Sequence, residues 1–151
     1  MLKYETVLGE YMKSKIVISD DVISLLWTCE ENENINDFSS AHFKIILNEN
    51  KKCVGTISYE LGMSTLNNVT YRIYQNYRKN GYATRALSLL KEIVKKCNFR
   101  GNKNLYLTPT NVFSEKVILN NDGELTQVFA MNDDYSAESD VCKVYEIKIG
   151  N

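Results

Sequence analysis

The chain has 151 residues, a length that fits one hydrophobic core, and we expect a single domain over residues 1–151. Its 18 basic and 19 acidic residues leave a net charge of −1, which argues against the strongly basic face that binds nucleic acid. No apolar run approaches the roughly 18 residues of a membrane span, and the four scattered cysteines and single histidine favour a cytoplasmic protein with no metal site.

The first half of the chain predicts an early strand, one helix and three consecutive antiparallel strands. Leu2–Leu8 is expected to be a strand, and Asp20 or Asp21 is expected to cap a helix that contains the apolar residues of 22–27. A turn at 48–52 rich in asparagine and lysine follows the first of the three later strands. These strands are predicted at His42–Leu47, Cys53–Leu61 and Asn68–Tyr74.

The second half contains the clearest helix of the sequence. Leu105–Leu107 then predicts a strand, Asn111 a helix cap, and two closing strands are expected at Leu125–Met131 and Val141–Ile149. The element order predicts an α+β fold with a central sheet flanked by helices. The face of the clear helix is formed by apolar residues at helical spacing: Ala83, Ala86, Leu87, Leu90, Ile93, Val94 and Cys97.

The loop between the strand at 68–74 and the clear helix is the part of the sequence that indicates a ligand. A helix start presents unpaired N–H groups and the positive end of the helix dipole, which together favour an anion. Gly81 would let a ligand approach the backbone, and Arg78, Lys79 and Arg85 add positive charge. The loop matches neither the P-loop nor the dinucleotide pattern. From spacing alone, phosphate binding and an ordinary helix start with charged neighbours both remain open.

Three segments resemble the GNAT superfamily of acyl-CoA-dependent N-acetyltransferases. Arg78–Ala83 matches the Q/R-x-x-G-x-G/A signature, Val54–Tyr59 resembles the strand that carries G-x-I, and Thr108–Gly123 resembles a segment that begins N-x-x-S-x-K-V-I. The branch that includes ribosomal-protein alanine acetyltransferases is the nearest in appearance. The resemblance implies a mostly antiparallel sheet that splays between its fourth and fifth strands, here 68–74 and 105–107.

The resemblance also implies a binding site for acetyl-CoA, which would serve as a co-substrate. Backbone N–H groups of the loop and helix start would hold the pyrophosphate. Main-chain groups of Ile73 and Tyr74 would pair with the pantetheine arm, with Asn111 and Ser114 on its other side. The implied coenzyme-binding residues are Ile73, Tyr74, Arg78, Lys79, Asn80, Gly81, Tyr82, Ala83, Thr84, Asn111 and Ser114.

In this chemistry an amine attacks the thioester directly in a ternary complex, and the N–H of Ile73 or Tyr74 is the expected donor to the oxyanion. Many family members carry a tyrosine as the acid at the position of Ile118, so that acid is missing here.

Tyr71 and Glu60 are the remaining candidate catalytic residues. Each also has an ordinary structural explanation, as a groove-lining aromatic and a solvated strand-end charge. His42 is expected to be structural or exposed.

Three functions remain open at this point. The first is an N-acetyltransferase that acts on a small-molecule amine or a protein N-terminus, with no nucleic-acid or membrane partner and with a homodimer as one arrangement. The second is a catalytically inactive acyl-CoA-binding sensor. The third is an unrelated α+β domain whose helix start binds another phosphorylated ligand or none.

Overall fold

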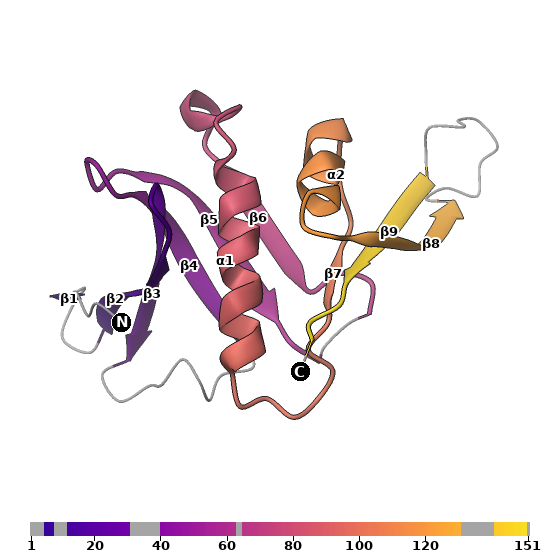
Figure 1. The fold of residues 1–151 in the computed structure, drawn as a ribbon, viewed down its shortest axis with the longest axis horizontal. Helices are drawn as coiled ribbons and strands as arrows, with labels where there is room; N and C mark the ends of the chain where they lie inside the picture. The colour runs from indigo at the N-terminus through magenta and orange to yellow at the C-terminus, as the bar shows by residue number, and fades with distance from the viewer. Residues whose placement is uncertain (1–4, 8–11, 31–39, 63–64, 131–140, 151) are drawn as a thin grey trace.

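The computed structural model describes residues 5–7, 12–30, 40–62, 65–130 and 141–150. Six strands form one antiparallel sheet in which each strand pairs with the next along the chain (Figure 1). They are β1 (Glu5–Val7), β2 (Met12–Ser19), β3 (Ile23–Glu30), β4 (Ser40–Leu47), β5 (Cys53–Glu60) and β6 (Val69–Ile73).

The rest of the described chain supplies two helices, a short 3₁₀ turn and a second, three-stranded antiparallel sheet in the order β7-β9-β8. Helix α1 crosses one face of the first sheet, and α2 stands beside it over the second sheet (Figure 1). The mixed α+β, mostly antiparallel fold is therefore confirmed. These elements are the 3₁₀ turn Gln75–Tyr77, α1 (Tyr82–Lys96), β7 (Leu105–Leu107), α2 (Val112–Leu119), β8 (Glu124–Ala130) and β9 (Val141–Ile147).

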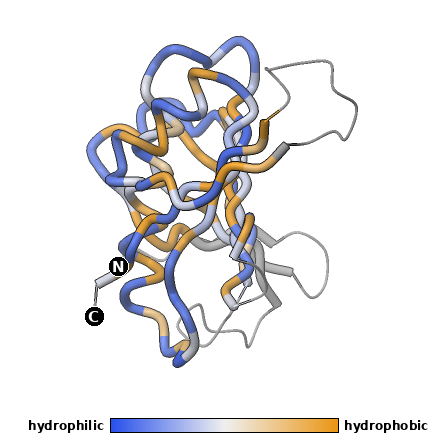
Figure 2. The backbone as a smooth tube through the Cα atoms, turned by 90° about the vertical axis from the view of Figure 1, so that its right-hand side faces the viewer, coloured by the Kyte–Doolittle hydropathy of each residue, from blue (hydrophilic) through white to orange (hydrophobic). Residues whose placement is uncertain are grey.

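The core lies between α1 and the sheet face that it covers. Leu87, Leu90 and Val94 of α1 are completely buried, as the helical spacing predicts. Figure 2 shows hydrophobic and hydrophilic stretches alternating along the tube, as expected for elements with one buried face. Within the described residues, no helix is long and apolar enough to cross a membrane.

The helix predicted after Asp20 is wrong, because this segment is the β2–β3 hairpin. The Asp20 carboxylate does accept N–H bonds from Val22 and Ile23, at 2.7 and 2.8 Å, but it closes a turn instead of starting a helix. Alternate residues Ile23, Leu25 and Trp27 are buried, which is the period of a strand. A short apolar run cannot be assigned by periodicity, and tertiary pairing decided its conformation.

Asn68 joins the two sheets at the base of the predicted splay. Its backbone N–H donates to the Tyr106 carbonyl at 2.9 Å, and its side-chain oxygen accepts from the Tyr106 N–H at 2.8 Å. Its side-chain amide also donates to the Asn104 carbonyl at 3.1 Å. Beyond Asn68, β6 belongs to the first sheet and β7 to the second, so the fourth and fifth strands of the sequence prediction do separate.

We expect Asn68→Ala to lower the free energy of unfolding by about 2–3 kcal/mol, because the buried Tyr106 N–H loses its acceptor. Urea unfolding measures the change. The exposed Asn76, replaced by alanine, is the control and should change stability by no more than about 0.5 kcal/mol. Equal losses for the two variants would contradict a special role for Asn68.

Candidate functional site

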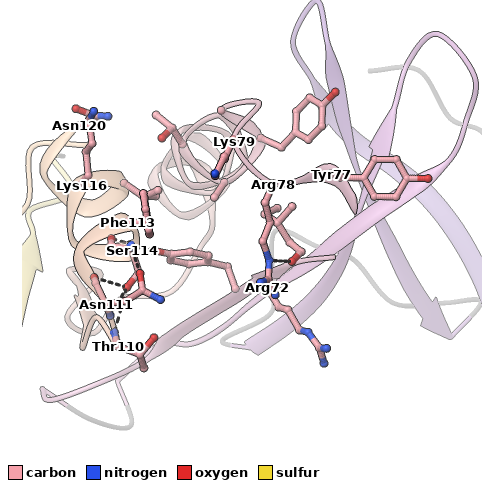
Figure 3. Close-up of a pocket in the computed structure, with 17 residues that line it drawn as sticks. Arg72, Tyr77, Arg78, Lys79, Thr110, Asn111, Phe113, Ser114, Lys116 and Asn120 are labelled. Carbon is pink, nitrogen blue, oxygen red and sulfur yellow. Dashed lines mark hydrogen bonds between the residues drawn. The ribbon is translucent and has the colours of Figure 1, made fainter. Parts of the chain in front are cut away.

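A cavity of about 690 Å³ lies between the end of β6, the start of α1 and one face of α2 (Figure 3). Two of the three segments that resemble the family, Arg78–Ala83 and Thr108–Gly123, contribute to its walls, and the third, Val54–Tyr59, does not. Two of the predicted coenzyme-binding residues, Tyr74 and Asn80, do not line it. The nine that do are Ile73, Arg78, Lys79, Gly81, Tyr82, Ala83, Thr84, Asn111 and Ser114.

The start of α1 offers N–H groups to this cavity. Gly81 is the N-cap residue, and neither a side-chain cap nor an acidic residue occupies the first turn. The first helical hydrogen bond runs from the Arg85 N–H to the Gly81 carbonyl, so residues 82–84 have no intrahelical acceptor. Lys79 and Gly81 both have positive φ, 67° and 78°, a backbone form that turns successive N–H groups inward. This geometry suits a bound anion.

Gly81 is required by its backbone conformation more than by crowding. With φ at 78° it adopts the left-handed form that glycine tolerates best. A Cβ built on it would meet no atom within 4 Å. The space beside Gly81 is therefore open, and a ligand could occupy it.

The edge of β6 that faces the splay is set by its pairing with β5. Tyr74 N–H donates to the Val54 carbonyl at 2.8 Å, and its own carbonyl accepts from Tyr77, so its main chain is engaged on both sides. Bonded and non-bonded residues alternate in an antiparallel ladder, so the main-chain groups of Ile73 and Tyr71 point away from β5. Of the two predicted oxyanion donors, the pairing leaves Ile73 and excludes Tyr74.

Two polar side chains shape the loop before α1. Arg78 donates from Nε to the Ile73 carbonyl at 3.0 Å, which places its guanidinium against the outward edge of β6 (Figure 3). The Asn80 side-chain amide donates to the carbonyls of Tyr77 and Arg78 at 3.0 and 3.2 Å. Asn80 thus supports the loop from outside the cavity.

The opposite wall is the first turn of α2. Asn111 caps it by accepting from the Ser114 N–H at 2.8 Å, and the Ser114 hydroxyl accepts in return from the Asn111 N–H at 3.2 Å. Tyr71 reaches across from β6 and donates its hydroxyl to the Ser114 carbonyl at 3.0 Å. Burial raises the Tyr71 pKa to about 12, although its bond to Ser114 partly opposes the shift.

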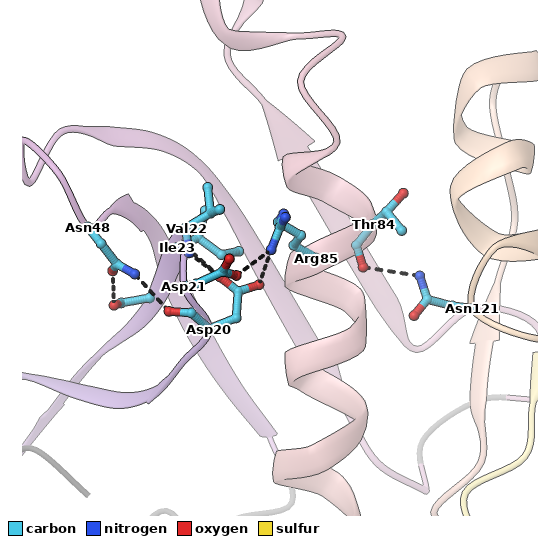
Figure 4. Close-up of polar contacts among 9 residues, drawn as sticks. Asp20, Asp21, Val22, Ile23, Asn48, Thr84, Arg85 and Asn121 are labelled. Atoms are coloured by element: carbon cyan, nitrogen blue, oxygen red, sulfur yellow. Dashed lines mark hydrogen bonds and ion pairs between the residues drawn. The ribbon is translucent and has the colours of Figure 1, made fainter.

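The far end of α2 is fixed to the first turn of α1 by Asn121, which is 3% exposed. Its side-chain amide donates to the Thr84 carbonyl at 3.2 Å and to the Val117 carbonyl at 3.1 Å (Figure 4). Asn121 thus holds the end of α2 and the first turn of α1 at a fixed distance, and this distance helps to set the width of the cavity.

Arg85 does not supply charge to the cavity, which corrects the expectation from sequence. Its guanidinium turns to the β2–β3 turn and pairs with Asp20 at 3.1 Å and Asp21 at 3.0 Å (Figure 4). Burial raises the pKa of Asp20, but the N–H bonds from Ile23 and Val22 and the bond from Arg85 outweigh it and leave that pKa below its ordinary value. The cations that line the cavity are Arg72, Arg78, Lys79 and Lys116.

We expect Asp20→Asn to destabilise the protein by about 1–2 kcal/mol at neutral pH. The asparagine side chain has one acceptor oxygen where the aspartate has two, so it cannot accept from Val22 and Ile23 and also bind Arg85, and the ion pair with Arg85 is lost. The Asp20 pKa is lower in the folded state, so its contribution is present above the unfolded value of 3.8 and disappears as pH falls through the folded value. Denaturant unfolding at neutral and acid pH measures this. Asp21→Asn, with an 85% exposed side chain, is the control.

Two positions that the sequence analysis linked to catalysis lie outside the cavity. Glu60 is exposed at the opposite end of β5, and its N–H donates to the Asn68 carbonyl, so the structure does not bring it to the site. Ile118, at the position where the family resemblance implied a tyrosine, is 1% exposed within the core. Tyr71 is therefore the one predicted catalytic residue that lines the cavity. His42 is exposed on β4, as expected.

Several lining residues were not predicted. Four of them lie at helical spacing on α2 and its C-cap: Phe113, Lys116, Val117 and Asn120. Their common face could have been found from the helical period, because the helix itself was predicted from its cap. No sequence signal marked the other three, which the fold brings to the cavity. The residues missed are Arg72, Tyr77, Thr110, Phe113, Lys116, Val117 and Asn120.

Comparison with known proteins agrees with this geometry. Residues 16–118 match the sequence model of the acetyltransferase (GNAT) family. No curated protein sequence matches the chain.

Three solved structures share the fold. RimL, a ribosomal L7/L12 alpha-N-protein acetyltransferase solved without ligand, has a TM-score of 0.55 at 13% identity, with 74% of this chain and 70% of RimL covered. A protein from Vibrio cholerae assigned as a ribosomal-protein-serine acetyltransferase has a TM-score of 0.52 at 16% identity, with 96% and 97% covered.

The third is the microcin C7 self-immunity acetyltransferase MccE, solved with acetyl-CoA and AMP, which has a TM-score of 0.53 at 15% identity. The match covers 72% of this chain and 60% of the MccE chain. At these identities the three structures establish a shared fold.

Proposed function

Because the chain belongs to the acetyltransferase (GNAT) family, we propose that it transfers the acetyl group of acetyl-CoA to a primary amine. The observation that carries this proposal is the cavity that joins the uncapped start of α1 to the outward edge of β6. An uncapped helix start favours a diphosphate, and a free strand edge can pair with an extended amide-containing arm.

In this proposal each wall has one task. The N–H groups of residues 82–84 hold the diphosphate, and Lys79 and Lys116 line the same cavity as counter-charges. The Ile73 N–H points to the splay, where the pantetheine arm would lie, and the α2 wall at Asn111 and Ser114 closes its other side. When bound, acetyl-CoA supplies the thioester.

The transfer itself balances without a metal or a covalent enzyme intermediate. The amine nitrogen forms a bond to the thioester carbonyl carbon, the carbon–sulfur bond breaks, the amine loses a proton and the departing sulfur gains one. We assign the hydrogen bond to the carbonyl oxygen to the Ile73 N–H, which faces away from β5. We assign the protonation of the sulfur to Tyr71, because Tyr71 lines the cavity and, with a pKa raised to about 12, carries its proton at ordinary pH.

The acceptor that we propose is the α-amine at a protein N-terminus, with a small-molecule amine as the alternative. RimL is described as an alpha-N-protein acetyltransferase and the Vibrio cholerae protein as a ribosomal-protein acetyltransferase, which supports the branch that the sequence resembles. MccE, whose name assigns it to self-immunity against microcin C7, supports the small-molecule alternative.

A protein that binds the coenzyme without transferring its acetyl group is the second candidate. Ile118 favours it, because the position of the usual acid is taken by a buried apolar side chain. This candidate and the enzyme share the same cavity and differ only in turnover.

Calorimetric titration with acetyl-CoA, followed by release of free thiol in the presence of amines, tests the proposal. We expect binding together with thiol release that depends on the amine. Binding without release for any peptide or small amine would support the sensor, and no binding at millimolar acetyl-CoA would exclude both functions.

A further inference from the structure

The face of the first sheet opposite α1 carries polar side chains. On β6, Tyr71 and Ile73 point to the helices, so Arg72 points to the other face (Figure 3). Register places Arg72 opposite Thr56, and Thr56 opposite Lys44, so these three side chains form one row across β6, β5 and β4. All three are exposed.

Two of the three side chains in this row, Lys44 and Arg72, are positively charged. Neighbouring strands lie about 4.8 Å apart, so the backbones of Lys44 and Arg72 are roughly 10 Å apart and their long side chains can reach one ligand. Among the residues whose side chains the structure describes, no carboxylate lies within ion-pair distance of Lys44 or Arg72. Glu60, an acid on the same face whose side chain the structure describes, is four residues along β5 from Thr56, roughly 13 Å away.

The row is at the end of the sheet where the reaction would occur. Arg72 is adjacent to Ile73, whose N–H faces the splay, and Arg72 also contributes to the lining of the cavity. If the coenzyme fills the side bounded by α1 and α2, an amine must approach the thioester from the remaining side. That approach passes the guanidinium of Arg72.

The open face favours a peptide over a small molecule. Small ligands are usually held in concave sites. Here the next row along the strands, His42, Ser58 and Thr70, continues as a polar surface, with the Ser58 and Thr70 hydroxyls 2.8 Å apart. An extended chain that places its amine at the splay would lie along these rows and leave its first side chains near the two cations.

We propose that this face binds the acceptor, and that the acceptor is a protein N-terminus with acidic side chains in the positions next to its amine. Arg72 contacts the first acidic group and Lys44 the second. The inference rests on the proposed function and specifies its substrate class.

The test compares three peptides that differ in charge, Ala-Glu-Glu-Ala-Ala-Ala, Ala-Gln-Gln-Ala-Ala-Ala and Ala-Lys-Lys-Ala-Ala-Ala, by amine-dependent thiol release. We expect kcat/KM to be highest for the acidic peptide and the preference to weaken as salt is raised. Arg72→Gln should lower kcat/KM for the acidic peptide by about 3–10-fold more than it lowers kcat/KM for the neutral peptide. Arg72→Glu should favour the lysine peptide.

Lys95→Gln is the matched control, because it removes one exposed positive charge at the far end of α1 and should change none of the three values. Glycine and aspartate, tested as free amines, distinguish a small carboxylated acceptor, and faster transfer to them than to the acidic peptide would overturn the peptide assignment. Turnover without any charge preference, or a preference that Arg72→Glu leaves unchanged, would overturn the inference while the proposed function stands. Failure to bind acetyl-CoA would instead remove the proposed function.

Discussion

Gly81→Asp is expected to weaken acetyl-CoA binding by about 100-fold or more while the protein still folds. The carboxylate would stand at the N-terminus of α1, where the proposed diphosphate lies, and like charges in contact cost several kcal/mol. Nothing in the folded protein blocks the new side chain, because its Cβ meets no atom within 4 Å. Calorimetry measures the affinity, and circular dichroism with thermal unfolding verifies the fold.

Gly81→Asn separates charge from backbone strain. Asparagine and aspartate tolerate a positive φ about equally well, and both add a side chain of the same size. We expect the asparagine variant to bind clearly better than the aspartate variant. If both bind as tightly as the unmodified protein, the diphosphate does not lie beside Gly81, and the coenzyme site proposed here is wrong.

Helices α1 and α2 and the three strands of the second sheet could be predicted from the sequence because their signals are local, although the sequence prediction put those strands in one central sheet. The apolar face of α1 repeats over four turns, and Asn111 caps α2 as the sequence predicts. The β2–β3 hairpin could not be predicted in the same way. Its apolar run 22–27 is compatible with either period, and only pairing with β4, far along the chain, selects the strand.

The site residues could be predicted where their position follows from the order of the motifs along the chain. The prediction failed where the position depends on which main-chain groups the strand pairing uses. Gly81 and Ser114 lie in motifs, and both line the cavity. Tyr74 was placed with Ile73 because they are neighbours, but the ladder turns one towards β5 and the other towards the splay. Arg85 was expected to add positive charge beside the loop because it follows Gly81, although its partners come from residues 20 and 21.

Gly55 shows how one residue keeps the site strand in place. A Cβ on Gly55 would collide with the carbonyl oxygen of Arg72 and press on the backbone of Ile73. Any larger residue would push β6 away from β5 at the point where Ile73 presents its N–H to the splay. The glycine of the G-x-I segment thus has a structural role that bears directly on the geometry of the reaction.

Strand β6 carries proposed functional groups on both of its faces and on its free edge. Its alternation sends Tyr71 to the helix side, Arg72 to the open side, and the N–H of Ile73 to the splay. Ile73 and Tyr71 are two residues apart, roughly 7 Å along the strand, which leaves room for a thioester whose oxygen meets one and whose sulfur meets the other.

Tyr71→Phe is therefore expected to lower kcat by about 100-fold and to change the Kd for acetyl-CoA by less than about threefold. Tyr71 lines the cavity, and burial raises its pKa to about 12, so its hydroxyl is protonated at assay pH and can give a proton but cannot act as a base. Its loss also removes the bond to the Ser114 carbonyl, at about 1 kcal/mol of stability. Single-turnover thiol release and calorimetry separate the two effects.

Tyr77→Phe is the matched control, since Tyr77 lines the same cavity and its hydroxyl makes no hydrogen bond to a described residue. We expect its kcat to remain within about twofold of the unmodified protein. A Tyr71→Phe variant with unchanged kcat would show that solvent protonates the sulfur and that Tyr71 serves only to hold α2 against β6. If kcat stays and Kd rises, the bond to Ser114 shapes the pantetheine channel and takes no part in the proton transfer.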